Sequence, residues 1–374
     1  MFNPNDAGFT SISGSLPDTL DGADAVGDYL VAVEGMGAGR IIEIAAEPIT
    51  IGRDPEQVLV FADTEISRRH ARVSTLAGMV VAEDLKSTNG TFIDGQRITG
   101  LTALREGSVL RVGRQLLKYE RRSRRDVERS RELSRDLEKA SSYLLSLLPA
   151  PIEKGLVLTS WRFQPSTQLG GDAFGYYWLE ADSFVFYLMD VSGHGVGAAM
   201  HSVAVLNVLR QRALPNVDFT DPGAVLSSLN DRFQMDAHDG MYFTMWYGVY
   251  RVAARTLFFS TAGHHPAYLI QPDRSTTIPL GMPDLMIGAV PDVAYAVQRA
   301  AVCPGSTVHL FSDGVFEIVT NEQQQWGLAD FLPHLVAPDI GGVSDAERLY
   351  RLVKAQTRGG VFDDDFSLLT VAFP

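Results

Sequence analysis

The feature that most constrains this chain is an apolar run that ends in one carboxylate and a glycine-containing turn. Residues 186–189 are aromatic or aliphatic, Asp190 follows them, and Gly193 and Gly195 then flank His194. Apolar runs bounded by glycines are typical of buried strands. A buried carboxylate is costly to desolvate unless a positive charge pairs with it. The stretch therefore predicts that Asp190 is held for a cation.

The same arrangement occurs three more times along the chain. Asp172 follows two glycines, Asp313 follows the apolar residues 308–311, and the triplet 363–365 of aspartates precedes the apolar residues 366–371. A turn cap explains one such aspartate equally well, but it does not explain an ordered set of four. Carboxylates without cysteine or a histidine cluster favour a hard, oxygen-ligated cation, Mg²⁺ or Mn²⁺.

Composition narrows the class of protein. The 374 residues, 45% of them hydrophobic, can bury one large core or two moderate ones. The single cysteine, Cys303, excludes an internal disulfide framework and a cysteine-built zinc site. No apolar run is long enough to span a bilayer, and the N-terminus lacks the pattern of a signal peptide, which predicts a cytoplasmic protein without a membrane partner. A net charge of −13 argues against nucleic acid as a partner.

The N-terminal third predicts an all-β domain. Residues 1–27 are rich in Gly, Ser, Asp and Pro and predict a flexible leader, whereas residues 28–118 alternate short strands with turns, as in a β-sandwich. Its loops carry two arginines and several neutral donors, a set suited to a phosphate and the backbone that bears it: Arg53, Ser67, Arg68, Thr88 and Asn89.

Residues 28–118 resemble a forkhead-associated (FHA) domain. The resemblance rests on the spacing of Gly52-Arg53, of Ser67-x-x-His70-Ala71, and of the Ser-Thr-Asn-Gly-Thr run at 87–91. It implies binding of phosphothreonine peptides through loops of a β-sandwich. By resemblance, Arg53, Ser67, Arg68, Thr88 and Asn89 form the binding set, and His70 braces the loops. A sandwich that keeps these loops without a ligand is the alternative.

Residues 119–150 predict a helical linker. An arginine-rich start is followed by mixed charge without glycine, and apolar residues recur at alternating spacings of four and three, at Leu133, Leu137, Ala140, Leu144 and Leu147. Such a short heptad seam pairs two chains or packs on the next domain. We expect a coiled coil that forms a homodimer.

Residues 151–374 alternate strands and helices irregularly, with helices expected at 197–210 and 222–233. This pattern predicts an α+β layered domain. Two divalent ions held by the strand-end carboxylates would activate a water for attack at phosphorus, and no Gly-x-Ser-x-Gly nucleophile elbow is present.

This segment resembles the metal-dependent (PPM-type) protein serine/threonine phosphatases, in their SpoIIE/RsbU-like bacterial branch. The motifs that carry the resemblance contain Asp172, the run 190–195, residues 262–264, Asp313 with Glu317, and the run 364–367. It implies two antiparallel sheets flanked by helices, two Mn²⁺ or Mg²⁺ ions between the sheets, and hydrolysis of phosphoserine or phosphothreonine.

The resemblance also implies roles for individual residues. Asp190 would bridge the ions, with the Val191 carbonyl as a further ligand. Asp313 and Asp364 would bind one ion, with Asp365 as the alternate to Asp364, and Asp172 would hold the other ion. His194 is a candidate general acid, or else it serves the turn. His264 and His265 have structural or substrate-edge roles rather than metal roles.

The sequence thus predicts a cytoplasmic signalling phosphatase in which an FHA domain, a dimerising linker and a PPM-type domain follow one another. By resemblance, its substrates are phosphoserine proteins such as anti-sigma-factor antagonists, and a phosphothreonine protein binds the FHA domain. The alternative is a non-catalytic adaptor that reads phosphopeptides and uses a phosphatase-like domain for binding. The presence of all four aspartates favours the enzyme.

Overall fold

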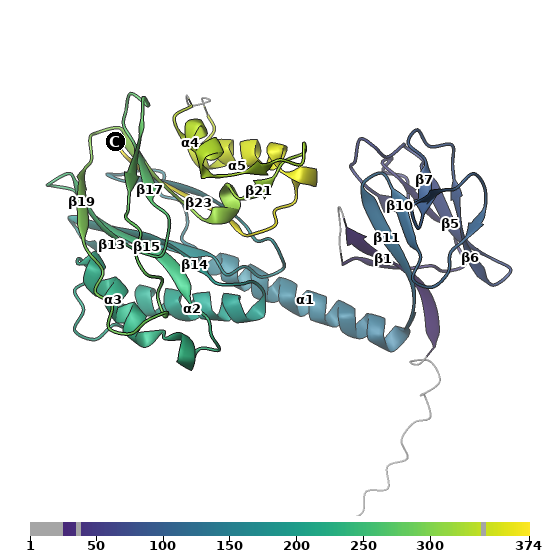
Figure 1. Ribbon diagram of the computed structural model, residues 1–374, viewed down its shortest axis with the longest axis horizontal. Helices are drawn as coiled ribbons and strands as arrows, with labels where there is room; N and C mark the ends of the chain where they lie inside the picture. Colours follow the sequence, from purple (N-terminus) through teal and green to yellow (C-terminus); the bar gives the residue numbers. More distant parts are fainter. Residues whose placement is uncertain (1–24, 35–38, 338–341) are drawn as a thin grey trace, which may run out of the picture. The chain divides into compact units, whose positions relative to one another are not determined.

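The computed structural model describes residues 25–34, 39–337 and 342–374, and the expected leader lies almost entirely outside them. The contacts divide the chain into two units, one ending at Ser134 and the other starting at Arg135. The division falls within helix α1 (Arg124–Leu147), the long helix drawn in Figure 1.

The N-terminal unit is a β-sandwich of two sheets. The first sheet has the order β2-β1-β11-β10-β7-β8, formed by Ile41–Glu43, Val26–Glu34, Gln115–Ser123, Val109–Val112, Thr91–Ile93 and Gln96–Arg97. The second has the order β4-β3-β5-β6-β9, formed by Leu59–Val60, Ile49–Gly52, Ala71–Leu76, Met79–Asp84 and Thr102–Ala103. Pairing is antiparallel except between β3 and β4. The expected β-sandwich is present.

Alternating side chains build the core of this unit. In β5 the alternate residues Ala71 and Val73 are fully buried, and in β3 Ile49 and Ile51 are buried in the same cluster. This period of two is the pattern of a strand with one face in a core. The residues that alternate with these buried ones point to the outer face of the sandwich, and the loops connect the strands at its ends.

Helix α1 starts later than the sequence suggested. The helix expected from residue 119 begins at Arg124, because Arg121 and Arg122 belong to β11 and pair there with Asp28 and Gly27. Ser123 caps the helix: its hydroxyl accepts a hydrogen bond from the Asp126 amide at 3.1 Å. The linker forms this one helix, and the residues that the structure describes do not show the expected coiled coil.

The C-terminal unit contains two five-stranded antiparallel sheets. One has the order β12-β23-β20-β17-β18, formed by Leu158–Gln164, Phe366–Phe373, Ser306–Phe311, Ala267–Ile270 and Thr277–Leu280. The other has the order β13-β14-β15-β16-β19, formed by Ala173–Glu180, Ser183–Val191, Phe243–Arg251, Thr256–Ala262 and Gln298–Ala301. A hairpin of β21 (Ile318–Val319) and β22 (Gln325–Trp326) is separate.

Helices cover the outer faces of both sheets. Helices α2 (Val196–Arg210) and α3 (Pro222–Arg232) pack on the β14 sheet, and α4 (Leu328–Leu335) and α5 (Asp345–Gln356) pack on the β23 sheet. Figure 1 shows the resulting layers, with α2 and α3 on one side and α4 and α5 on the other. Short 3₁₀ turns occur at Met235–Ala237, Asp313–Val315 and Arg358–Gly360.

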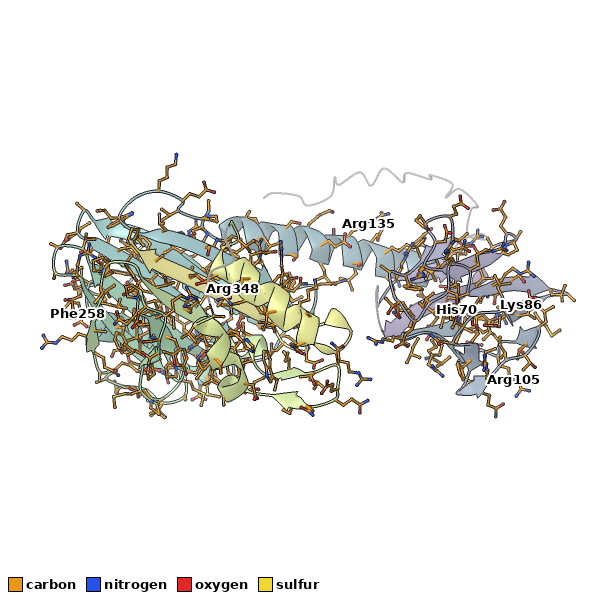
Figure 2. The ribbon with its side chains drawn as sticks, turned by 90° about the horizontal axis from the view of Figure 1, so that it is seen from above. His70, Lys86, Arg105, Arg135, Phe258 and Arg348 are labelled. Carbon is orange, nitrogen blue, oxygen red and sulfur yellow. The ribbon has the colours of Figure 1, made fainter. Side chains whose placement is uncertain are left out.

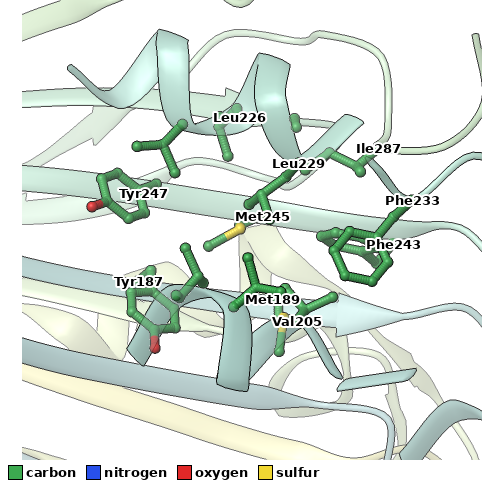
Figure 3. Packing of buried hydrophobic residues seen from close by; sticks show 14 of the residues in the cluster. Tyr187, Met189, Val205, Leu226, Leu229, Phe233, Phe243, Met245, Tyr247 and Ile287 are labelled. Carbon is green, nitrogen blue, oxygen red and sulfur yellow. The ribbon is translucent and has the colours of Figure 1, made fainter. Parts of the chain in front are cut away.

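Strand β14 is buried on both faces, which explains its continuous apolar sequence. Tyr187 and Met189 point into the cluster under α2 and α3, shown in Figure 3, whereas Phe186 and Leu188 point into the cluster between the sheets. By this alternation the next residue, Asp190, belongs to the face between the sheets. None of the helices in the described residues is long and apolar enough to cross a membrane.

Candidate functional site

The aspartates at residues 172, 190, 313 and 364 lie at the ends of strands from both sheets. Asp190 is the penultimate residue of β14 and pairs with Thr244 of β15. In the facing sheet, β20 and β23 are neighbours, and their ends carry Asp313 and Asp364. Two facing sheets therefore present carboxylates toward the same end of the space between them.

The turn after β14 needs its two glycines. Gly193 and Gly195 have φ of 82° and 86°, in the left-handed region that disfavours other residues. Ser192 is fastened to the neighbouring strand, since its amide donates to the Tyr242 carbonyl and its hydroxyl accepts from the Tyr242 amide. His194 is left exposed at the tip of the turn.

The loop before Asp172 lies against this turn. The Gly195 amide donates to the Leu169 carbonyl at 3.2 Å. A Cβ on Gly171 would lie 2.8 Å from the Val191 carbonyl oxygen, so only glycine permits this approach. Asp172 is buried, and its carboxylate lies close enough to Asp190 for a hydrogen bond between them.

The carboxylates perturb one another electrostatically. Burial raises the pKa of Asp172 well above its usual value, and the charges of Asp190 and Asp365 add to this effect. Burial, with the charges of Asp313 and Asp364, raises the pKa of Asp190 to about 8. Burial and the Asp364 charge raise the pKa of Asp313 to about 6. Such mutual perturbation is typical of functional sites.

These residues fit a divalent cation. Asp172 Oδ2 is buried without a hydrogen-bond partner, and a cation would both occupy it and relieve the repulsion. A set of oxygen donors suits Mg²⁺ or Mn²⁺. Among the residues that the structure describes, no three His, Cys, Asp or Glu side chains are already grouped to hold one ion.

Asp365 has surroundings different from those of its neighbour Asp364. It is buried, and its carboxylate accepts hydrogen bonds from Ser166 and from the amides of Gly171 and Asp172. Asp364 is exposed and accepts one hydrogen bond, from the Asp365 amide at 2.7 Å. The anchoring of Asp365 had no sequence signal beyond its place in a run of three aspartates.

The two consecutive histidines lie inside the fold. His264 and His265 bond through Nδ1 to the carbonyls of His265 and Pro266, and each Nε2 is buried without a partner. Burial lowers the pKa of His264 to about 3 and that of His265 to about 4. Both rings are therefore neutral near pH 7, and His265 packs on Phe311 at 4.8 Å between ring centroids.

In the N-terminal unit, the structure brings together the three loops that carry the expected binding residues. The Arg53 amide donates to the Ser67 carbonyl, the Thr88 amide donates to the Ser67 hydroxyl, and Asn89 Nδ2 donates to the Glu65 carbonyl. Arg53, Arg68, Thr88 and Asn89 are exposed, and Ser67 is half-buried. These hydrogen bonds hold the three loops side by side.

One buried and one half-buried side chain hold these loops. His70 Nδ1 accepts from the Ser67 amide at 3.1 Å, so Nε2 carries the proton and donates to the Gly90 carbonyl at 3.1 Å. Asp84, which the sequence reasoning did not single out, accepts from the hydroxyls of Ser87 and Thr91. Burial opposes ionisation of Asp84, but the hydrogen bonds from Ser87 and Thr91 outweigh it and lower its pKa.

Family models agree with both halves of this architecture. The model described as stage II sporulation protein E (SpoIIE) matches residues 180–374, just over half of the chain. The chain belongs to the SpoIIE family. The FHA domain model matches residues 49–113 of this SpoIIE-family chain. Both resemblances inferred from the motifs are confirmed.

Relatives of this SpoIIE-family chain match its two halves separately. FhaB of Mycobacterium tuberculosis is 38% identical over 86 residues, 23% of this chain and 56% of FhaB. The phosphoserine phosphatase RsbP of Bacillus subtilis is 28% identical over 196 residues, 51% of this chain and 46% of RsbP. The phosphoserine phosphatase RsbU of the same organism is 26% identical over 191 residues, 50% of this chain and 56% of RsbU. The chain spans about half the length of these relatives.

Solved structures agree on the fold of the C-terminal unit. The SiaA-PP2C domain of Pseudomonas aeruginosa has a TM-score of 0.57 at 20% identity, over 65% of this chain and 98% of that domain. The PP2C phosphatase domain of SpoIIE from Bacillus subtilis has a TM-score of 0.50 at 18% identity, over 58% of this chain and 62% of that structure. The SpoIIE-family part therefore has a PP2C-like fold.

Proposed function

We propose that this chain is a metal-dependent phosphatase that hydrolyses phosphoserine or phosphothreonine on proteins. The observation that carries the proposal is the group of aspartates at strand ends between the two sheets, whose pKa values burial and mutual repulsion raise. The names of RsbP and RsbU, phosphoserine phosphatases, support phosphoserine as the substrate class.

The proposed ligands come from both sheets. Asp190 would bridge two ions with help from the Val191 carbonyl, Asp313 and Asp364 would hold one ion, and Asp172 would hold the other. When bound, two Mn²⁺ or Mg²⁺ ions supply charge neutralisation and activate a water for in-line attack at phosphorus. The aspartates fix the ligand geometry, and the sheets that carry them keep it rigid.

His194 would handle the proton of the leaving group. It lies exposed on the turn that follows Asp190. Burial raises the pKa of Asp364 and the nearby His194 opposes this rise, a proximity that supports the proposal. From there, a protonated ring nitrogen would donate to the serine oxygen as the ester bond breaks. A structural role in the turn is the alternative for this residue.

The N-terminal unit would read a phosphothreonine protein through Arg53, Ser67, Arg68, Thr88 and Asn89. Arginine forks and neutral donors on converging loops suit a phosphate on a peptide backbone. We further propose a cytoplasmic homodimer formed through α1, an FHA domain at 28–118, a linker at 119–150 and a phosphatase domain at 151–374. Binding at the FHA domain would recruit substrate or alter catalysis, and an anti-sigma-factor antagonist is the proposed type of substrate.

The test is release of phosphate from a phosphoserine protein with and without Mn²⁺. Wild type is compared with Asp190→Asn and Asp313→Asn, which keep the side-chain size and remove a charged ligand. We expect Mn²⁺-dependent activity that falls by at least 100-fold in each variant, because each substitution removes a proposed metal ligand. Asp292→Asn, a change at an exposed aspartate, is the control that should retain activity.

Two results would contradict the proposal. A folded wild type that binds Mn²⁺ and releases no phosphate, with or without an FHA ligand, would favour the adaptor. Activity that survives in both variants would place the chemistry elsewhere.

A further inference from the structure

The carboxylate of Asp365 is fully engaged by protein donors. Oδ1 accepts from the amide of Ser166 at 2.8 Å and from its hydroxyl at 3.0 Å. Oδ2 accepts from the amide of Gly171 at 2.7 Å and from that of Asp172 at 3.4 Å. A carboxylate offers about four lone-pair directions. These four donors therefore leave no favourable direction for a cation.

Asp365 also connects to the strand end that carries Asp313. Its carbonyl accepts from the Ser312 hydroxyl at 2.8 Å, and that hydroxyl in turn accepts from the Ser367 amide at 3.1 Å. The Ser312 amide donates to the Ser367 carbonyl. One residue thus holds the loop before Asp172 and the residue before Asp313.

Gly170 and Gly314 both lie very close to Asp365. A Cβ on Gly170 would lie 2.4 Å from Asp365 Oδ2, and a Cβ on Gly314 would lie 2.3 Å from the Asp365 carbonyl oxygen. Neither glycine has positive φ. Space for Asp365, rather than backbone conformation, therefore explains glycine at these two positions.

We propose that Asp365 is a positioning residue that sets the relative placement of Asp172, Asp313 and Asp364, and is not itself a metal ligand. The proposal rests on the proposed function, because those three aspartates are the proposed ligands. Buried groups that orient metal ligands typically change metal affinity about 10–100-fold when they are removed. Asp365 reaches three ligands at once and has its own oxygens occupied.

The experiment compares Asp365→Asn with Asp363→Asn. Both remove one negative charge next to Asp364, but Asp363 is exposed and Asp365 holds the two loops. Mn²⁺ binding is measured by calorimetry, and phosphate release is measured over a range of Mn²⁺ concentrations. We expect Asp365→Asn to weaken Mn²⁺ binding by at least about tenfold. At saturating Mn²⁺ its kcat should return to within a few-fold of wild type, and Asp363→Asn should match wild type.

A second variant tests the same inference independently, in case Asp365→Asn does not fold. Gly170→Ala leaves every carboxylate in the chain and pushes against Asp365 Oδ2. It should weaken Mn²⁺ binding in the same direction. Thermal unfolding in EDTA establishes that each variant is folded before binding is measured.

The outcomes separate this inference from the proposed function. Unchanged Mn²⁺ affinity in folded Asp365→Asn and Gly170→Ala overturns the inference. Loss of binding and activity at every Mn²⁺ concentration, as in Asp190→Asn, makes Asp365 a ligand and also overturns it. A wild type that binds Mn²⁺ without hydrolysis refutes the function alone, because calorimetry still tests Asp365. A wild type that binds no Mn²⁺ refutes both.

Discussion

His70 is buried in the N-terminal sandwich (Figure 2), between the loops that carry the proposed binding residues. Replacing it with alanine would leave the Ser67 amide and the Gly90 carbonyl without partners. We predict that His70→Ala lowers the free energy of unfolding of this unit by about 2–3 kcal/mol. We also predict that it weakens phosphothreonine-peptide binding at least tenfold, measured by chemical denaturation and fluorescence anisotropy.

Alanine variants of Arg53 and Arg69 are compared with His70→Ala. Both are exposed, so Arg53→Ala and Arg69→Ala should change stability by less than about 0.5 kcal/mol. Arg53→Ala should weaken binding, whereas Arg69→Ala should leave it near wild type. Unchanged stability in His70→Ala would contradict the bracing role assigned to this histidine.

At the scale of single residues, the sequence singled out the aspartates but could not decide between Asp364 and Asp365 as the metal ligand. The motif resemblance placed a ligand within the run of three aspartates. That run lies before β23 begins at Phe366, so no strand alternation in the sequence distinguishes one aspartate from the next. The distinction depends on Ser166 and Gly171, which lie almost 200 positions away along the chain. A local pattern carries no information about such partners.

Among the elements, α5 is fastened to its sheet by a buried charged cluster. Asp345 accepts from Arg348 Nη2 at 2.8 Å and from Arg274 Nη1 at 3.1 Å, and His309 Nε2 of β20 lies 3.4 Å away. The same arginines donate to carbonyls at the end of α4, His334 and Leu335. The cluster thus joins α4, α5 (which carries Arg348 in Figure 2) and the sheet.

We predict that Asp345→Asn destabilises the C-terminal unit by about 3–5 kcal/mol at pH 7, because it leaves two arginines without their counter-charge. Only 6% of the Arg348 side chain and 23% of the Arg274 side chain are exposed. Chemical denaturation measures the change. The exposed control Asp292→Asn should stay within about 0.5 kcal/mol of wild type. Equal stability of the two variants would mean that the cluster contributes little.

The same cluster sets a dependence on pH. Burial raises the pKa of Asp345, but the neighbouring His309 ring and the hydrogen bonds from Arg348 and Arg274 outweigh it and hold the pKa well below its usual value. Burial lowers the pKa of His309, so near neutral pH the arginines carry the positive charge. A lowered carboxyl pKa contributes stability that is present above the unfolded value, about 4, and is lost as pH falls toward the folded value. The stability difference between wild type and Asp345→Asn should therefore shrink below about pH 4.

The two helices expected in the C-terminal unit are present, but several other elements had not been expected. The helices expected at 197–210 and 222–233 are α2 and α3, whereas α4, α5, the hairpin of β21 and β22, and the strands β18 and β19 were missed. Of the missed strands, β18 and β19 are the edges of their sheets. β18 contains Pro279 and β19 contains Gln298 and Arg299, residues that an edge tolerates and that hide the alternating pattern. Their pairing depends on neighbours rather than on their own composition.

At the scale of the whole molecule, the two ends of the apolar seam of α1 differ in what they contact. Leu144 lines a small cavity with Leu148, Phe163 and Leu206 of the C-terminal unit, so this end of the seam is used within the chain. Leu133 is 62% exposed. A heptad pattern indicates an apolar stripe on a helix but does not indicate what covers that stripe. For this reason the sequence left two alternatives, pairing with a second chain and packing on the next domain.

We predict that the full chain is dimeric through the part of α1 that carries Leu133 and Leu137. Leu133→Glu with Leu137→Glu should convert it to a monomer without changing its thermal stability, as measured by sedimentation velocity. Leu144→Glu should instead lower the Tm, because it places a charge against the apolar wall of the cavity. A monomeric wild type at micromolar concentration would contradict the dimer.

The place of β23 in its sheet has a consequence for how the protein is made. This strand, the last of its sheet along the chain, lies between β12 and β20 and begins two residues after Asp364. A chain emerging from the ribosome cannot complete this sheet, or bring the aspartates together, until residues 364–373 are out. The sandwich of residues 26–123 has all its strands much earlier. During synthesis, the proposed phosphothreonine-binding domain would therefore be complete before the proposed catalytic site.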